Sequence, residues 1–101
     1  MTTQLTTNEK FAIIAILSEI MKADGIIHPK EEEYINGIYR LLEVTINDLE
    51  DIENMDSIQA KTIIERMTEE KKNYSRSLFL EMAKCDGYVH PKELKIINSL
   101  F

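Results

Sequence analysis

The segment "KADGIIHPKE", residues 22–31, recurs as "KCDGYVHPKE" at residues 84–93. Both copies place Asp-Gly before two hydrophobic residues and His-Pro-Lys-Glu after them. Glycine can take the left-handed conformation that closes a helix, and proline suits the first position of the next helix. The repeat therefore predicts two related helix-corner-helix units in one chain, in which Lys22 is equivalent to Lys84.

Hydrophobic residues elsewhere follow helical spacing and rarely alternate as they do in strands. Thr6 and Glu9 match a capping box, which predicts a helix from Thr6 to about Ala23. Residues 11–17, "FAIIAIL", are apolar on all sides. A helix of this kind is either covered on several sides or presents a partner-binding face.

Further helices are expected to begin at Pro29, after Thr45, at Asp56, at Thr68 and at Pro91. Their apolar residues, Leu41, Ile46 and Ile58 among them, are expected to face inward. With 101 residues, of which 44% are hydrophobic, the chain suits one packed core. We expect an all-α fold, a compact bundle of about five to seven helices forming a single domain over residues 1–101.

Acidic residues flank each expected corner: Asp24 and Glu31 at the first, Asp86 and Glu93 at the second. Glu31 and Glu93 lie three residues after a histidine, where a carboxylate caps a helix N-terminus. The two Asp residues fall at the negative end of the preceding helix, so each needs a compensating partner. A divalent cation is one such partner, because hard cations prefer carboxylate oxygens. Structural capping is the alternative.

The second half of an EF-hand loop has the same Asp-Gly and Glu spacing. However, the positions that should hold its first ligands are apolar or basic, namely Ile20, Lys22, Met82 and Lys84. A functional EF-hand is therefore not expected. His28 and His90 are interpreted as helix N-caps, and their imidazoles are candidate auxiliary ligands for a metal.

The composition argues against several classes of function. A net charge of -6 disfavours nucleic acid as the main partner, because phosphate binding requires a basic surface. The chain contains no nucleophile triad, phosphate loop or CxxC motif, so we do not expect an enzyme. The opening residues lack a secretory leader, and the single cysteine, Cys85, cannot form an internal disulfide. We expect a cytoplasmic protein.

The segments "MKADGIIHPKEEEYI" (21–35) and "MAKCDGYVHPKELKII" (82–97) resemble the twin signatures of the TerB-like superfamily. This group includes the tellurite-resistance protein TerB and a module of DjlA-like co-chaperones. The signature, A-D-G-x-hydrophobic-x-x-x-E, matches the first copy in full, and Cys85 replaces its alanine in the second. The resemblance, over roughly residues 8–101, implies an all-helical bundle, a role in chemical stress and divalent-cation binding at the signature acids.

The expected function is therefore that of a small stress-associated module, acting by partner or divalent-cation binding at its acidic corners. Protein partners are expected, membrane-associated ones among them, and a homodimer is compatible with the sequence. The alternative is a purely structural or protein-interaction module with neither a metal nor a tellurite role. A third class, an enzyme that uses carboxylates for acid–base chemistry, would need a concave pocket with shifted pKa values.

Overall fold

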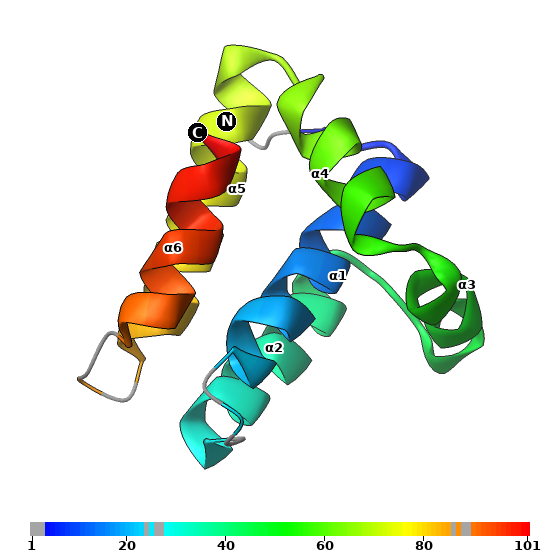
Figure 1. Cartoon of the computed structure of the whole chain (residues 1–101). Coiled ribbons are helices and arrows are strands. Elements are labelled where there is room, and N and C mark those ends of the chain that lie inside the picture. Colours follow the sequence, from blue (N-terminus) through cyan, green and yellow to red (C-terminus); the bar gives the residue numbers. More distant parts are fainter. Residues whose placement is uncertain (1–3, 24, 26–27, 86, 88–89) are drawn as a thin grey trace.

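Helices separated by short connections make up the described structure (Figure 1). The computed structural model describes residues 4–23, 25, 28–85, 87 and 90–101. Within these ranges there is no strand, and the all-α prediction is confirmed. The elements are α1 (Thr7–Lys22), α2 (Pro29–Leu41), the 3₁₀ turn η1 (Ile46–Asp48), α3 (Leu49–Asn54), α4 (Ser57–Glu65), α5 (Glu69–Lys84) and α6 (Pro91–Leu100).

The predicted helix starts are confirmed by their caps. The Thr6 hydroxyl accepts a hydrogen bond from the Glu9 N–H at 3.2 Å, and Glu9 accepts one from the Thr6 N–H at 2.8 Å. The Asp56 carboxylate accepts from the Gln59 N–H at 2.7 Å at the start of α4. Thr68 caps α5 in the same way. Each cap satisfies a backbone donor that the helix itself leaves without a partner.

The first helices of the two helix-corner-helix units match in length as well as in their place relative to the repeated segment. Helices α1 and α5 both end at the lysine that opens the repeated segment, Lys22 or Lys84, and they have the same length. Helices α2 and α6 both begin at its proline. Helix α1 packs against α2 and α5 against α6, while α1 also contacts α5 and α6, and α2 contacts α5. The four helices are therefore related by an approximate two-fold arrangement, with α3 and α4 added on one side of α1.

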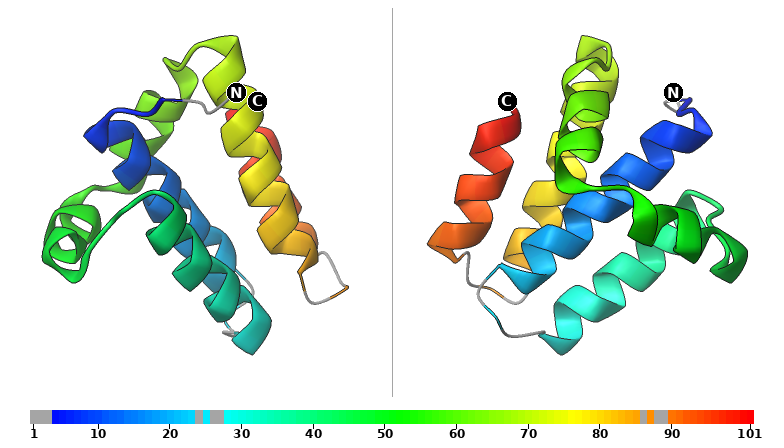
Figure 2. Two further views of the ribbon diagram at one scale, coloured as in Figure 1. Left: turned by 180° about the vertical axis from the view of Figure 1, so that it is seen from behind. Right: turned by 45° about the vertical axis from the view of Figure 1, so that its right-hand side comes forward.

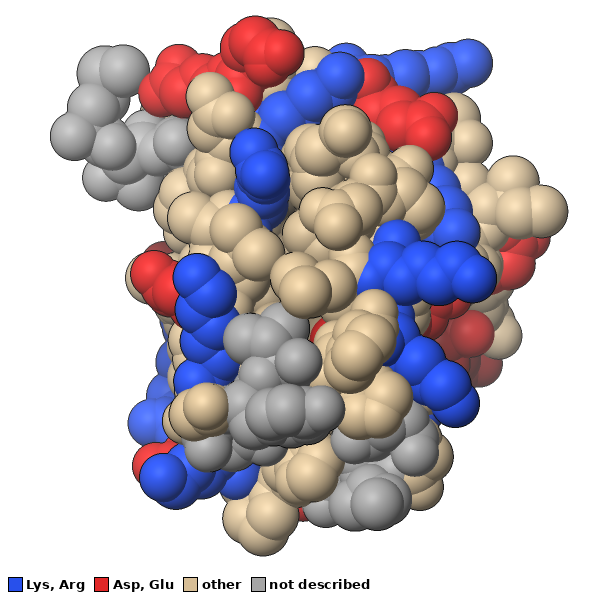
Figure 3. All heavy atoms as spheres, turned by 60° about the vertical axis from the view of Figure 1, so that its left-hand side comes forward, with Lys and Arg blue, Asp and Glu red and all other residues tan. Residues whose placement is uncertain are grey.

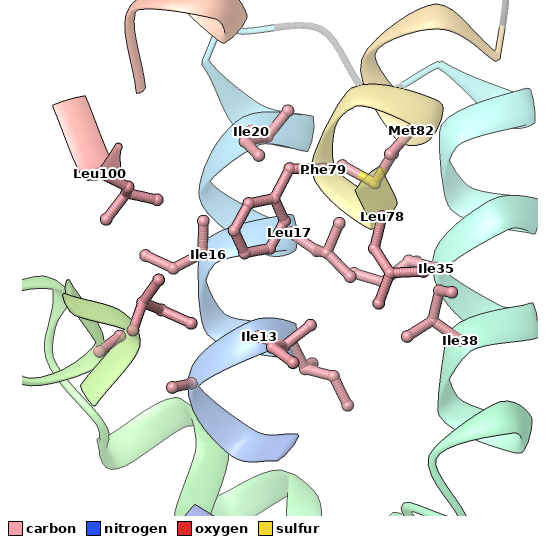
Figure 4. Packing of buried hydrophobic residues seen from close by; sticks show 14 of the residues in the cluster. Ile13, Ile16, Leu17, Ile20, Ile35, Ile38, Leu78, Phe79, Met82 and Leu100 are labelled. Atoms are coloured by element: carbon pink, nitrogen blue, oxygen red, sulfur yellow. The ribbon is translucent and has the colours of Figure 1, made fainter. Parts of the chain in front are cut away.

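Helix α1 is the centre of the molecule. It contacts all five other α-helices, and its side chains at Ile13, Ile16, Leu17 and Ile20 are fully buried. Figure 4 shows Leu78, Phe79 and Met82 of α5 beside them. Leu100 of α6 lies on one side of α1, and Ile35 and Ile38 of α2 lie on the other. Of the two interpretations of this apolar helix, the structure supports the helix covered on several sides.

Three residues that were expected to face inward are exposed instead. Leu41 retains 59% of its accessible surface, Ile58 77% and Ile46 81%. Leu41 lies at the end of α2, Ile46 in η1 and Ile58 in the first turn of α4. Helical spacing predicts which face of a helix is apolar, but at a helix end no neighbouring element extends far enough to cover that face.

The helix ends that flank the two corners lie at the same end of the molecule. In the views of Figures 1 and 2, the C-terminal ends of α1 and α5 and the N-terminal ends of α2 and α6 all lie low, while both chain termini lie high. Figure 3 shows the face turned forward from the left of Figure 1, where Lys and Arg side chains lie on both sides of a mostly uncharged strip and Asp and Glu lie mainly near the top and the edges. Most of the acids belong to the part of the chain before Met55, and most of the Lys and Arg to the part after it.

One ion pair connects the N-terminal ends of the two long helices. The Lys71 ammonium lies 2.8 Å from the Glu9 carboxylate, and both side chains are largely buried. Glu9 and Lys71 occupy the third position of α1 and of α5, so the pair joins equivalent positions of the two units. Burial alone would raise the pKa of Glu9, but hydrogen bonds from Lys71 and Thr6 outweigh it, and the pKa lies below its ordinary value of 4.5.

Glu9→Gln should lower the free energy of unfolding by about 1 kcal/mol at neutral pH, because glutamine keeps the capping hydrogen bond and removes the charge facing Lys71. Since folding lowers the pKa of Glu9, its contribution is fully present above the pKa in the unfolded chain. The difference between wild type and variant should therefore disappear as the pH falls through the folded pKa. Denaturant unfolding at several pH values measures this. Glu65→Gln, an exposed control, should change stability by less than about 0.5 kcal/mol, and a difference independent of pH would contradict the assignment.

Candidate functional site: the acidic helix corners

Both corner glycines adopt the conformation that the sequence predicts. Gly25 has a φ of 79° and Gly87 a φ of 86°, in the left-handed region that L side chains rarely enter. The Gly25 N–H donates to the Lys22 carbonyl at 3.0 Å, and the Gly87 N–H donates to the Lys84 carbonyl at 2.9 Å. A β-carbon at either position would meet no other atom within 4 Å. Backbone conformation, not space, is therefore the reason for glycine at these positions.

At the second corner, His90 and Glu93 form the predicted capping box. The Nδ1 atom of His90 accepts a hydrogen bond from the Lys92 N–H at 3.1 Å, and Oε1 of Glu93 accepts one from the His90 N–H at 3.2 Å. The interpretation of His90 as an N-cap is confirmed. While this cap is formed, the Nδ1 lone pair is engaged by the backbone and is not available to a metal ion.

The first corner has the same backbone plan with a different cap. His28 occupies the N-cap position of α2 with an extended backbone, φ -87° and ψ 133°, and Pro29 follows as the first helical residue. The His28 side chain forms no cap hydrogen bond with the amides of α2, so the capping box of the second corner is not repeated between these described residues. The caps of the two corners therefore differ at their histidines.

Glu31 and Glu93 share an environment that spacing alone does not reveal. Glu31 retains 1% of its accessible surface and Glu93 3%, which makes them the buried acids of the described chain. The second oxygen of Glu93, Oε2, is buried and has no hydrogen-bond partner within the described ranges. Burying an ionised oxygen without a hydrogen-bond partner is costly, so a cation close to this atom would stabilise the carboxylate.

Asp24 and Asp86, the other two predicted ligands, lie outside the described residues. The structure therefore does not place them relative to Glu31 and Glu93. Among the residues that it does describe, no group of three or more His, Cys, Asp or Glu side chains is arranged to hold a metal ion. The corner carboxylates that are described thus supply one buried acid per corner.

A hydrogen bond that the sequence does not reveal links the two units close to the corners. The Tyr34 hydroxyl, in the second turn of α2, donates to Oε2 of Glu81, in the last turn of α5, at 2.8 Å. Burial and the bond to the Glu81 carboxylate together raise the pKa of Tyr34, so the phenol stays protonated and remains a donor. The helix that leaves the first corner is thereby attached to the helix that enters the second.

These observations define an all-α module built from two related helix corners, each with a buried glutamate. The family model described as "Tellurite resistance protein TerB" matches residues 1–54, which include α1, the first corner and α2. The chain therefore belongs to the TerB family, as its repeated signature predicts. No curated protein and no solved structure matched the chain.

Substituting the corner glycines should be destabilising, whereas the same substitution inside a helix should not. Gly25→Ala and Gly87→Ala should each lower the free energy of unfolding by about 1 kcal/mol, since each forces alanine into the left-handed region. Gly37→Ala, in the interior of α2 with open space around it, should instead raise it by about 0.5–1 kcal/mol. Thermal and urea unfolding measure both. A shift of the same sign at all three positions would contradict this account.

Tyr34→Phe should lower the free energy of unfolding by about 1 kcal/mol, because the hydrogen bond to Glu81 is lost while the ring is kept. Tyr39→Phe is the matched control, since the half-buried Tyr39 hydroxyl makes no hydrogen bond within the described ranges. If the bond is the cause, Tyr34→Phe should add little in a Glu81→Ala background, which has no side-chain oxygen to accept the bond. Equal losses in both backgrounds would assign the effect to packing.

Proposed function

We propose that this chain is a cytoplasmic TerB-type module that binds a divalent cation at its acidic corners and acts with protein partners in the response to tellurite and other chemical stress. It acts by binding and not by catalysis. The cation ligands proposed at each corner are the Asp and Glu of the signature, Asp24 with Glu31 and Asp86 with Glu93. His28 and His90, the N-cap residues of α2 and α6, are proposed as auxiliary ligands of the cation.

The observation that best supports a cation is the burial of Glu93 with one oxygen unpartnered. Its other oxygen accepts from the His90 N–H, which orients the carboxylate. Glu31, the equivalent residue of the first unit, is buried to the same degree. A hard cation at this point would compensate the buried charge and draw oxygen ligands together.

The alternative is a structural or protein-interaction module without a metal. The capping box of Glu93 supports it, because a cap accounts for one carboxylate oxygen with no ion. The exposed side chains of Leu41, Ile46 and Ile58 would then be points of contact for a partner chain or a second copy. Membrane-associated partners belong to either version of the proposal. No helix in the described ranges is long and apolar enough to cross a membrane.

Titration calorimetry with Ca²⁺, Mg²⁺, Mn²⁺ and Zn²⁺ tests the cation proposal. We expect saturable heat with at least one of these ions, and a melting temperature that rises with its concentration, because the ion binds the folded chain. Glu31→Gln and Glu93→Gln should each weaken binding by about tenfold or more. Glu32→Gln removes the same charge from the first turn of α2 at an exposed position and should leave the affinity nearly unchanged.

Two results would reject the cation proposal. One is the absence of binding of any of the four ions at millimolar concentration. The other is unchanged affinity in the double variant Asp24→Asn with Asp86→Asn. In that case Glu93 acts as a cap, and Glu93→Ala, which removes the accepting oxygen, should lower the free energy of unfolding by about 1 kcal/mol with no dependence on added ion.

A further inference from the structure

A cavity of about 370 Å³ lies between α1, α2, α3 and the start of α4. These elements belong mostly to the part of the chain before Met55, which holds most of the acidic residues. Its volume is within the range of sites for small molecules, about 300–1,000 Å³. Apolar side chains form part of its lining, among them Met21, Ile52 and Met55. Two acidic residues, Glu19 and Glu53, also line the cavity.

The residue equivalent to Glu19 in the second unit accepts a hydrogen bond that Glu19 lacks. Its equivalent is Glu81, whose carboxylate accepts the hydrogen bond from Tyr34. The residue equivalent to Tyr34 is Ile96, which has no hydroxyl to donate to Glu19. Within the described chain, no hydrogen bond or ion pair holds the half-buried Glu19 carboxylate. It lines the cavity instead.

Glu53 approaches the same cavity from α3. Burial raises the pKa of Tyr39, and the negative charge of Glu53 raises it further, so this charge acts directly on the phenol that also lines the cavity. Tyr39 therefore keeps its proton and offers a ring face and a hydroxyl. Lys22 is the one cation among the described lining residues, which leaves the cavity with a formal excess of negative charge.

We propose that this cavity binds an organic cation, an alkylammonium or alkylguanidinium group, whose charged head lies between Glu19 and Glu53 and whose carbon chain lies against Met21, Ile52 and Met55. The combination of residues favours this ligand over an inorganic ion. A hydrated metal ion would use the two carboxylates and leave the apolar wall in contact with water. An alkyl cation uses both, and the Tyr39 ring can also attract its charge.

Agmatine and butylamine are suitable probes, and 1-butanol is the neutral control because it has the same chain without the charge. Nuclear magnetic resonance titration of the isotope-labelled protein should show saturable shifts at residues lining the cavity with both amines. The affinity for 1-butanol should be at least about tenfold lower than the affinity for butylamine. Equal affinities for butylamine and 1-butanol would overturn the proposal, as would the absence of amine binding at millimolar concentration.

Three variants test the carboxylates. Glu19→Gln should weaken agmatine binding about tenfold, the loss expected for an ion pair with a partly buried carboxylate, and Glu53→Gln about fourfold, because Glu53 is more exposed. Glu50→Gln is the matched control, because Glu50 is an exposed acid of the same α3 helix that does not line the cavity. It should change the affinity less than about twofold. If Glu50→Gln weakens binding as much as Glu53→Gln, attraction to the net negative charge explains the binding and the site does not exist.

The charged group can come from a free amine or from a basic side chain of a partner protein, and one further comparison distinguishes the two. An arginine-containing peptide with blocked termini that binds more tightly than agmatine, and loses this affinity in Glu19→Gln, assigns the site to a protein partner. Weaker binding of the peptide assigns it to a free amine. Neither outcome depends on the cation proposed at the helix corners, because Glu31 and Glu93 do not line this cavity.

Discussion

The burial of α1 is the constraint on which the rest of the structure depends. A helix that is apolar on all sides cannot remain in water, and five helices around it are needed to cover it. The helices of the two units would leave part of that surface exposed, because α2, α5 and α6 do not surround α1 completely. Helices α3 and α4 cover the remaining side. The segment between the two units is therefore part of the core, with Ile52, Ala60 and Ile64 buried against α1.

This central position explains why the two units have diverged. Both α1 and α5 bury the positions that face each other, for example Leu17 and its equivalent Phe79. On the opposite side, α1 has the buried Ile14 where α5 has the exposed Arg76. The second unit thus keeps the amphipathic pattern of a surface helix, whereas the first has lost its polar face. The same asymmetry places Tyr34 beside Glu81 but leaves Glu19 at the edge of a cavity.

Local chemistry accounts for what the sequence predicts well. The cap at Thr6, the left-handed glycine at Gly25 and the proline at the start of α2 each depend on residues within a few positions of one another. Inward-facing residues were predicted less well at Leu41 and Ile46, because exposure there depends on how far neighbouring elements extend. The His90 side chain accepts a cap hydrogen bond and the His28 side chain does not, so an identical His-Pro-Lys-Glu segment does not ensure an identical cap.

Features that join distant parts of the chain were outside the reach of sequence reasoning. The burial of Glu31 and Glu93, the Tyr34–Glu81 bond and the cavity beside Glu53 arise from tertiary packing. The internal repeat supplied an indirect signal for some of them, because it marks Glu19 and Glu81 as equivalent. The predicted role of the corner aspartates remains a prediction.

The Glu9–Lys71 pair bears on how a repeated chain of this kind can arise. In a symmetric dimer of identical units, only a residue on the two-fold axis faces its own copy, and a charged residue there would face an equal charge. Joining the units in one chain removes this restriction, because each position can then mutate alone. Here the two units differ at equivalent positions, so an acid can face a base. The ion pair also holds the two units together. Replacing either residue with its counterpart, Glu9→Lys or Lys71→Glu, would place two like charges opposite each other.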